Sequence, residues 1–356
     1  MSAIRIVVVD DSALFRTLLR NAITELPECE VVASVADGKS AIRKIEELKP
    51  DLVTLDVEMP EMNGIAVLQE LQRRRSTSRV VMVSRFTATG AQVTTDALLQ
   101  GAFDFILKPS GKDAAANKSE LRVALAEKIA ALRDTRVSPV DAAVPPQAPT
   151  GRSEPPAGCE AIVIGCSTGG PDALGQVLPQ LKPDLEVPVF VVQHMPESFT
   201  ASLATRLNEA CELEVAEAAD GLRAGPGQIV LARGGRHLLL KRRGPNRFTV
   251  RLTDDPPENS CRPSVDYALR SAVDAMGARV LAVVLTGMGR DGLEGCRLVR
   301  SRGGRVIAQH ADGCTVYGMP KVVITSGQAD RIVKLHEIPR AIEMTLQEMS
   351  SGLERD

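Results

Sequence analysis

The stretch AIVIGCSTGGP, residues 161–171, joins a short apolar run to a turn rich in glycine. A continuous apolar run of this length is typical of a strand that is buried on both faces of a parallel sheet. Glycines at positions 165, 169 and 170 allow the sharp turn that leads from such a strand into a helix. The order of strand, turn and helix predicts an α/β fold, and it places Ser167 at the carboxyl end of a strand.

The same alternation continues through the second half of the chain. Further strands are predicted in VPVFVVQH, ELEVAEA, GQIVLA, RVLAVVLTG and RVIAQH, with helices between several of them. The segment HLLLKRRGPNRFTVRLTD interrupts the pattern and predicts an antiparallel hairpin that turns at Gly244-Pro245-Asn246. A last helix is expected near Pro339 to Met349. We therefore predict one larger α/β domain, with a doubly wound parallel sheet, over residues 159–350.

The first part of the chain shows a similar pattern. Its apolar runs are IRIVVVDD, EVVASVAD, DLVTLDVEM, RVVMVSRF and FDFILKP. Between them lie amphipathic stretches such as ALFRTLLRNAITEL, whose apolar residues share one helical face: Leu14, Leu18, Leu19, Ala22 and Ile23. A fifth helix is expected from Ser119 to Arg133. This pattern predicts a second doubly wound parallel sheet over residues 1–135. Residues 136–158 carry six prolines without any periodicity and predict a linker.

The overall composition excludes several classes of protein. A formal net charge of −2 over 356 residues argues against a general nucleic-acid binder, and the basic cluster Lys241-Arg242-Arg243 is interpreted as solvated surface. No apolar run approaches the ~18 residues that span a membrane, so no membrane insertion is expected. Seven cysteines without a C-x-x-C pair are typical of reduced thiols, and they predict a cytoplasmic protein without a zinc framework.

Polar side chains follow the predicted strands of the first domain. Asp10 and Asp11 come after the first strand, and Asp56 comes after the third. Ser84 and Lys108 follow the fourth and fifth strands. Because the carboxyl ends of parallel strands meet at one edge of a sheet, we expect these groups to lie together. Three carboxylates at one place repel one another unless a hard cation such as Mg²⁺ lies among them.

Three interpretations compete for the turn after residues 161–166. A phosphate-binding P-loop is excluded, because no Lys followed by Ser or Thr comes after the glycines. Gly165-Cys166-Ser167-Thr168-Gly169 does satisfy G-x-S-x-G, the pattern of a nucleophilic serine on a turn between strand and helix. A glycine-rich turn without chemistry is the remaining alternative.

A nucleophilic serine needs a base and a carboxylate that orients it. Of the four histidines, His194 ends the strand expected beside residues 161–166, and His310, at the end of a later strand, is its rival. Asp291 follows the run VLAVVLTG. Ser167, His194 and Asp291 are thus all predicted at carboxyl ends of strands, on one edge of one sheet. Their order in the chain differs from the Ser, Asp, His order of α/β-hydrolases.

The turn that contains Asp291 also fits another pattern. Residues 287–292, GMGRDG, read G-x-G-x-x-G, and Asp312 stands 20 residues beyond Gly292, which is the spacing of a dinucleotide-binding site. This interpretation is less favourable, because the turn comes late in its domain. The carboxylate of Asp291 would also face the pyrophosphate.

These motifs together resemble a known family. VDDS, LDVEMPEMNG, VVMVS and FDFILKPS are similar to the receiver domain of two-component response regulators. IGCSTGG, VQHMP and LTGMGRDGLEG resemble the chemotaxis response regulators that are protein-glutamate methylesterases, the CheB family. The resemblance implies a flavodoxin-like receiver over residues 1–135, a Pro-rich linker over 136–158 and an α/β methylesterase domain with an antiparallel hairpin over 159–350.

For the receiver, the resemblance implies that Asp56 accepts a phosphoryl group from a chemotaxis-type histidine kinase. Lys108 would contact the acyl phosphate, and Ser84 and Phe105 would form the switch pair. Mg²⁺ would be held by the acceptor and its surroundings, with Glu58 contributing its backbone carbonyl: Asp10, Asp11, Asp56 and Glu58.

For the second domain, the resemblance implies that Ser167 is the nucleophile, His194 the general base and Asp291 its orienting carboxylate. Thr168 and Met288 would line the site, with backbone N–H groups near Met288 as oxyanion donors. The implied reaction is a phosphorylation-activated hydrolysis of glutamate γ-methyl esters on methyl-accepting chemoreceptors, which releases methanol. Deamidation of receptor glutamines is implied as a second activity. No cofactor is expected in this domain.

Overall fold

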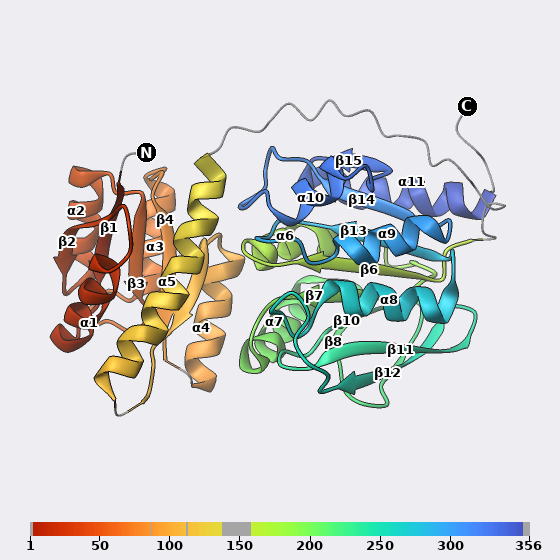
Figure 1. Cartoon of the computed structure of the whole chain (residues 1–356), viewed down its shortest axis with the longest axis horizontal. Helices are drawn as coiled ribbons and strands as arrows, with labels where there is room; N and C mark the ends of the chain where they lie inside the picture. Colours follow the sequence, from red (N-terminus) through yellow and green to blue (C-terminus); the bar gives the residue numbers. More distant parts are fainter. Residues whose placement is uncertain (1–2, 86, 112, 137–157, 352–356) are drawn as a thin grey trace. The chain divides into compact units, whose positions relative to one another are not determined.

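The computed structural model describes residues 3–85, 87–111, 113–136 and 158–351. The chain separates into two compact units, Met1–Arg136 and Val137–Asp356 (Figure 1). The predicted linker lies, apart from its two end residues, outside the described residues. No helix in these described ranges is both long and apolar enough to cross a membrane.

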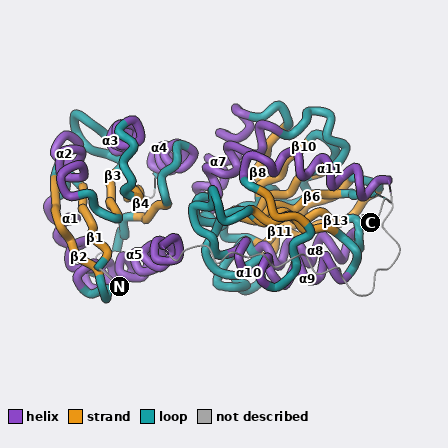
Figure 2. Tube along the Cα trace, turned by 90° about the horizontal axis from the view of Figure 1, so that it is seen from above, coloured by secondary structure: helices purple, strands orange, loops and turns teal. Residues whose placement is uncertain are grey.

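In its described part, the first unit forms a five-stranded parallel sheet in the order β2-β1-β3-β4-β5. Helix α1 packs against α5, while α2 packs against α3 and α3 contacts α4, so that helices cover both faces of the sheet (Figure 2). The strands are β1 (Ile4–Val9), β2 (Cys29–Val35), β3 (Leu52–Asp56), β4 (Arg79–Ser84) and β5 (Asp104–Leu107). The helices are α1 (Ala13–Thr24), α2 (Gly38–Leu48), α3 (Gly64–Arg73), α4 (Ala88–Leu99) and α5 (Ala114–Arg136).

The local sequence explains where these elements begin and what they bury. Each of the first four helices has a polar N-cap side chain that accepts a hydrogen bond from a backbone amide of the first turn: Ser12, Asp37, Asn63 and Thr87. Leu19, Ala22 and Ile23 of α1 are buried as predicted, but Leu14 in its first turn is 81% exposed. Helix α5 begins at Ala114, five residues before the predicted start at Ser119.

The described part of the second unit is built around a seven-stranded sheet in the order β15-β14-β13-β6-β7-β10-β8, whose strands pair in parallel. The strands are β6 (Ala161–Cys166), β7 (Val189–Gln193), β8 (Glu214–Glu217), β10 (Gln228–Leu231), β13 (Val280–Val284), β14 (Arg305–Gln309) and β15 (Arg331–Val333). The chain runs from β6 to β7 on one side and later returns to place β13 on the other side of β6. The carboxyl ends of β6 and β13 therefore flank a topological switch point, where ligands of open α/β sheets bind.

Helices cover the two faces of this sheet. Contacts join α8 to α9 and α9 to α10, and they join α6 to α7 and to the 3₁₀ turn before α11. Figure 2 shows α8, α9 and α10 on one side of the sheet and α7 and α11 on the other. The helices are α6 (Gly170–Val177), α7 (Glu197–Ala210), α8 (Val265–Met276), α9 (Leu293–Ser301), α10 (Met319–Thr325) and α11 (Ile338–Ser351), with 3₁₀ turns at Leu178–Gln180 and Leu335–Glu337.

The predicted hairpin is the core of a second, antiparallel sheet. Strands β11 (His237–Gly244) and β12 (Arg247–Thr253) pair across the turn, and the short strand β9 (Arg223–Ala224) adds to β12. The ring of Phe248 on β12 packs edge to face on Phe190 of β7, with 5.7 Å between ring centroids. This apolar contact links the two sheets, and α8 packs against β11.

The close approach of β6 to α8 depends on Gly165. A Cβ on residue 165 would lie 2.5 Å from Val265 Cγ1, at the start of α8. We therefore expect Gly165→Ala to lower the free energy of unfolding of the second unit by roughly 1–3 kcal/mol, because the core there is already filled. Chemical unfolding of the full chain, followed by circular dichroism, measures the change.

Gly244→Ala is the matched control, since nothing lies within 4 Å of a Cβ at that position. Its effect should stay within about 0.5 kcal/mol. Equal effects of the two substitutions would contradict the packing described for Gly165.

Candidate active site

Ser167 lies in the turn between β6 and α6, and its backbone is firmly held. Its amide donates to Thr286 O (3.0 Å), and its carbonyl accepts hydrogen bonds from Gly170 N (2.7 Å) and Gln193 Nε2 (3.0 Å). Gly169 has a φ of 77°, in the left-handed region that favours glycine. The side chain of Ser167 is half-buried, so its hydroxyl reaches the surface from a fixed backbone.

The turn that follows β13 packs closely on Ser167. A Cβ on Gly287 would lie 2.8 Å from Ser167 Cβ, so only glycine allows this approach. Met288 is the next residue and is half-buried. Within the described residues, the Met288 amide donates to no acceptor. The amide is therefore free to donate to a group bound beside Ser167. Thr168 is 7% exposed, and its carbonyl accepts a hydrogen bond from Thr286 Oγ1 (3.0 Å).

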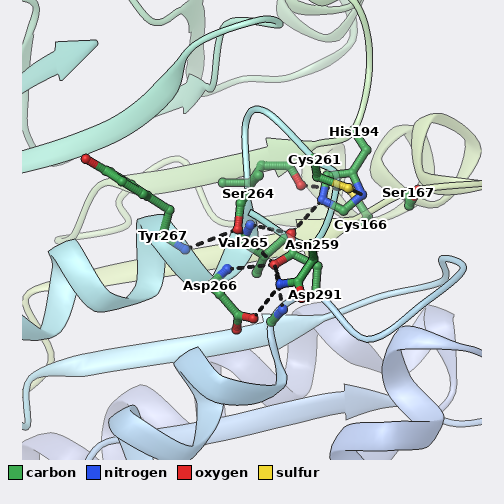
Figure 3. A network of polar contacts seen from close by, with 12 residues as sticks. Cys166, Ser167, His194, Asn259, Cys261, Ser264, Val265, Asp266, Tyr267 and Asp291 are labelled. Atoms are coloured by element: carbon green, nitrogen blue, oxygen red, sulfur yellow. Dashed lines mark hydrogen bonds and ion pairs between the residues drawn. The ribbon is translucent and has the colours of Figure 1, made fainter. Parts of the chain in front are cut away.

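His194 follows β7, the strand beside β6. Its Nε2–H donates to Asp291 Oδ2 at 2.8 Å, and its Nδ1 lies 3.5 Å from Cys261 Sγ (Figure 3). As far as the structure describes the chain, no hydrogen bond joins Ser167 Oγ to His194. The structure thus brings the predicted base and carboxylate into direct contact and places the serine at the same edge.

Asp291 is only 2% exposed, and the surrounding chain satisfies its charge. The donors come from the start of α8, the loop before it and the turn that holds Asp291: Val265 N (2.7 Å), Asp266 N (3.1 Å), Ser264 Oγ (2.9 Å), Asn259 Nδ2 (2.9 Å) and Gly292 N (3.1 Å). Free amides and the helix dipole favour a negative charge at a helix N-terminus. The site therefore holds Asp291 as a carboxylate.

The contact between Asp291 and His194 shifts the pKa of both groups. Burial acts to raise the pKa of Asp291, but the hydrogen bonds and charge of His194, with the amides of α8, outweigh it and lower the pKa to about 2. Burial acts to lower the pKa of His194, but Asp291 and Cys261 outweigh it and raise the pKa to about 9. Asp291 is thus positioned to stabilise an imidazolium.

A second carboxylate, Asp266, belongs to the same network. Asn259 Nδ2 donates to Asp266 Oδ2 as well as to Asp291 Oδ1, both at 2.9 Å. Burial, opposed by a hydrogen bond from Gly295 N and reinforced by the charge of Asp291, raises the pKa of Asp266 to about 6. As the pH falls, Asp266 takes up a proton before Asp291 does.

Sequence reasoning did not find Asn259, Cys261 or Ser264. A signal existed for Ser264, because a serine directly before the periodic run VDYALRSAV is a typical helix N-cap. Its Oγ accepts a hydrogen bond from Tyr267 N at 3.3 Å. Asn259 and Cys261 lie in an irregular segment between β12 and α8, and no local pattern marks them.

The residues of the two alternative interpretations, the rival base and the dinucleotide-binding pattern, make other contacts. His310, the rival base, is exposed at the end of β14, where its Nδ1 accepts a hydrogen bond from Asp312 N (3.0 Å). Asp312, the acidic residue of the dinucleotide pattern, forms an ion pair with Lys334 at 2.7 Å. Asp291, which belongs to the same pattern, accepts a hydrogen bond from His194.

The first unit gathers its predicted polar residues at the carboxyl edge of its own sheet. Asp10 is fully buried and Asp56 is 2% exposed, whereas Asp11 is exposed. Carboxylate oxygens of the three residues lie within 4.8 Å of one another. Lys108 Nζ lies 2.6 Å from Asp10 Oδ2 and 2.8 Å from Asp56 Oδ2. Burial and the charge of Asp10, opposed by Lys108, raise the pKa of Asp56 to about 6.

This cluster fits a hard divalent cation. Its donors are carboxylate oxygens, which Mg²⁺ prefers. Burial and, to a smaller extent, the charge of Asp10 raise the pKa of Asp56, and a bound cation would oppose both effects. Glu58 places its amide 3.4 Å from Asp56 Oδ1. Ser84 is 1% exposed, with Oγ donating to Gly90 O at 3.3 Å, and Phe105 is half-buried on β5. The roles assigned to Glu58, Ser84 and Phe105 stay predictions.

Comparison with known protein families assigns a separate family to each of the two units. Residues 162–342 match the CheB methylesterase family, and residues 6–119 match the response regulator receiver domain. The chain is 42% identical to a protein-glutamate methylesterase/protein-glutamine glutaminase of Desulfotalea psychrophila, over 98% of this chain and 100% of the relative. It is 41% identical to a protein of the same name from Thermotoga maritima, over 95% of this chain and 97% of the relative.

A solved structure resembles the second unit. The crystal structure of the Thermotoga maritima CheB methylesterase catalytic domain matches with a TM-score of 0.51 and 42% sequence identity. The match covers 52% of this chain and 98% of that domain.

The environment of His194 predicts an unusual titration. In Asp291→Asn, the pKa of His194 should fall from about 9, because the hydrogen bond and the charge of Asp291 that oppose burial are lost. Proton NMR of the histidine side chains measures this, and four histidines are few enough to assign by substitution. Asp134→Asn, which removes an exposed carboxylate of α5, is the control and should leave the titration of His194 unchanged. A His194 that titrates near 6.5 in the parent chain would contradict the network.

Proposed function

The chain belongs to the CheB methylesterase family, and on this premise we propose that it is a receiver-controlled protein-glutamate methylesterase and protein-glutamine glutaminase. Its substrates are glutamate γ-methyl esters and glutamine side-chain amides of methyl-accepting chemoreceptors. The observation that carries the proposal is the contact of Asp291 with His194 at the sheet edge where Ser167 follows β6. We assign this chemistry to residues 159–350 and its control to residues 1–135.

The reaction begins with the attack of Ser167 Oγ on the side-chain carbonyl. Only the neutral imidazole of His194 can act as the base, and because its pKa is raised to about 9, this form is the minor one at neutral pH. Nε2–H donates to Asp291, so Nδ1 is the nitrogen that receives the serine proton. Contacts between a nucleophile and its base are often long without substrate and tighten only when substrate binds. His194 then passes the proton to the departing methoxy oxygen or amide nitrogen, which leaves as methanol or ammonia, and water hydrolyses the acyl-enzyme.

Asp291 and Met288 support the charges that develop. Asp291 stays ionised because the amides of α8 and His194 hold its pKa at about 2, so it stabilises the imidazolium formed during attack. The Met288 amide, next to Gly287 against Ser167, is the oxyanion donor we assign. One such donor contributes about 100-fold or more in rate. Thr168 and Met288 line the site.

Control comes from the receiver edge, with Asp56 as the acceptor of a phosphoryl group from a chemotaxis-type histidine kinase. When bound, Mg²⁺ would supply positive charge for the phosphoryl oxygens. It would be held by Asp10, Asp11, Asp56 and the backbone carbonyl of Glu58. Lys108 already contacts Asp56 and would pair with the added charge, to which Ser84 and Phe105 would respond.

Ser167→Ala should lower the release of methanol from methylated receptor membranes by ~1000-fold or more, since the alanine has no nucleophile. Methanol is measured directly after incubation with the purified full chain. The matched control is Ser301→Ala, an exposed serine of α9 whose Oγ donates to Leu298 O within its own helix. Release that persists in Ser167→Ala but not in Ser301→Ala would sink the assignment.

A small-molecule phosphodonor with Mg²⁺ should raise methanol release by the parent chain, and Asp56→Asn should abolish this stimulation. The reason is that the amide cannot accept the phosphoryl group. Asp134→Asn, which changes an exposed aspartate near the end of α5, should keep the full stimulation. Stimulation of equal size in Asp56→Asn would place the acceptor elsewhere.

A further inference from the structure

Beside Asp291, His194 faces a group that the proposed reaction does not use. Cys261 Sγ lies 3.5 Å from His194 Nδ1, and Figure 3 shows the sulfur on the side of the ring away from Asp291. Cys261 is a free, half-buried thiol. Backbone hydrogen bonds with Glu258, Cys261 N to Glu258 O (2.9 Å) and Glu258 N to Cys261 O (3.1 Å), hold it in place.

The distance between these two atoms suits a metal ion. Thiolate sulfur and imidazole nitrogen are preferred zinc ligands, with bonds of about 2.3 Å and about 2.0–2.1 Å. At a tetrahedral angle, these bond lengths separate sulfur and nitrogen by about 3.6 Å. The observed 3.5 Å between Cys261 Sγ and His194 Nδ1 matches this separation. The two atoms are therefore at a separation that one shared ion requires.

The surroundings also orient the imidazole as a metal ligand. Histidines that bind metals usually donate their other ring N–H to a carboxylate, which fixes the ring and makes the free nitrogen more basic. His194 Nε2–H donates to Asp291 Oδ2 at 2.8 Å, and α8 in turn holds Asp291. The ligand atoms of His194, Cys261 and Asp291 lie within 4.8 Å of one another.

We propose that His194 Nδ1 and Cys261 Sγ bind a thiophilic divalent cation such as Zn²⁺, with water in the remaining coordination positions. Binding releases to solvent the protons that the two ligands carry. Mg²⁺, which prefers oxygen ligands, belongs instead to the carboxylates of the first unit. Metal binding does not depend on the proposed function, but the predicted effect of the metal on ester hydrolysis does. The ion occupies the nitrogen that receives the Ser167 proton, so it inhibits ester hydrolysis.

Cobalt titration of the reduced, metal-free full chain tests the site, because a thiolate ligand produces charge-transfer absorption that oxygen ligands do not. We expect this absorption in the parent protein and its displacement by Zn²⁺. Cys261→Ser should abolish it, and Asp291→Asn should weaken cobalt affinity about 10–100-fold. Cys211→Ser, which removes another half-buried thiol, is the control and should keep the full absorption.

Circular dichroism confirms that each variant is folded. Absorption that is absent from the folded parent, or unchanged in Cys261→Ser, would overturn the proposal. Methanol release then tests the consequence, since Zn²⁺ should inhibit the parent at concentrations at least ~10-fold lower than it inhibits Cys261→Ser. Cobalt binding at Cys261 without inhibition by Zn²⁺ would support the metal site and contradict the assignment of Nδ1 as the base.

Discussion

The second unit depends on keeping one carboxylate charged inside the protein. An ion removed from water costs several kcal/mol unless good hydrogen bonds and an opposite charge replace the solvent. Asp291, at 2% exposure, meets this condition through donors from four places: the start of α8, Asn259, its own turn and His194. The segments around residues 194, 259–266 and 291 are far apart in the chain. Satisfying one buried charge therefore fixes how β7, β13 and α8 come together.

Glycines provide the close packing that this network needs. Gly165 lets α8 approach β6, so that the first amides of α8 reach Asp291. Gly287 lets the turn after β13 lie against Ser167. The same arrangement that orients His194 through Asp291 also places its Nδ1 next to Cys261 Sγ. Catalysis and metal binding would therefore compete for one atom.

The two units use carboxylates at a sheet edge in opposite ways. In the second unit, donors surround Asp291 and lower its pKa to about 2. In the first unit, Asp56 is buried beside Asp10 and its pKa is raised to about 6, although Lys108 contacts both carboxylates. The arrangement in the second unit keeps Asp291 ionised, so that it can stabilise a positive charge on His194. The arrangement in the first unit leaves an excess of negative charge that a divalent cation can neutralise, which suits a site that binds Mg²⁺ and a phosphoryl group.

The ends of the apolar runs predict which polar residues reach the carboxyl edges of the two sheets. Ser167, His194 and Asp291 each follow a strand closely, and parallel strands end at a common edge, so apolar runs and their ends were enough to predict that these three residues share one edge. The tertiary structure alone decided that β13 lies beside β6, that α8 holds Asp291, and that Asn259 and Cys261 join the site. Contacts between distant segments also produce the two-residue strand β9 and the three-residue strand β15, and they leave Leu14 exposed. Periodicity records which face of a segment is apolar and where that segment ends. Strand order and loop paths follow from contacts between distant segments, which local patterns do not encode.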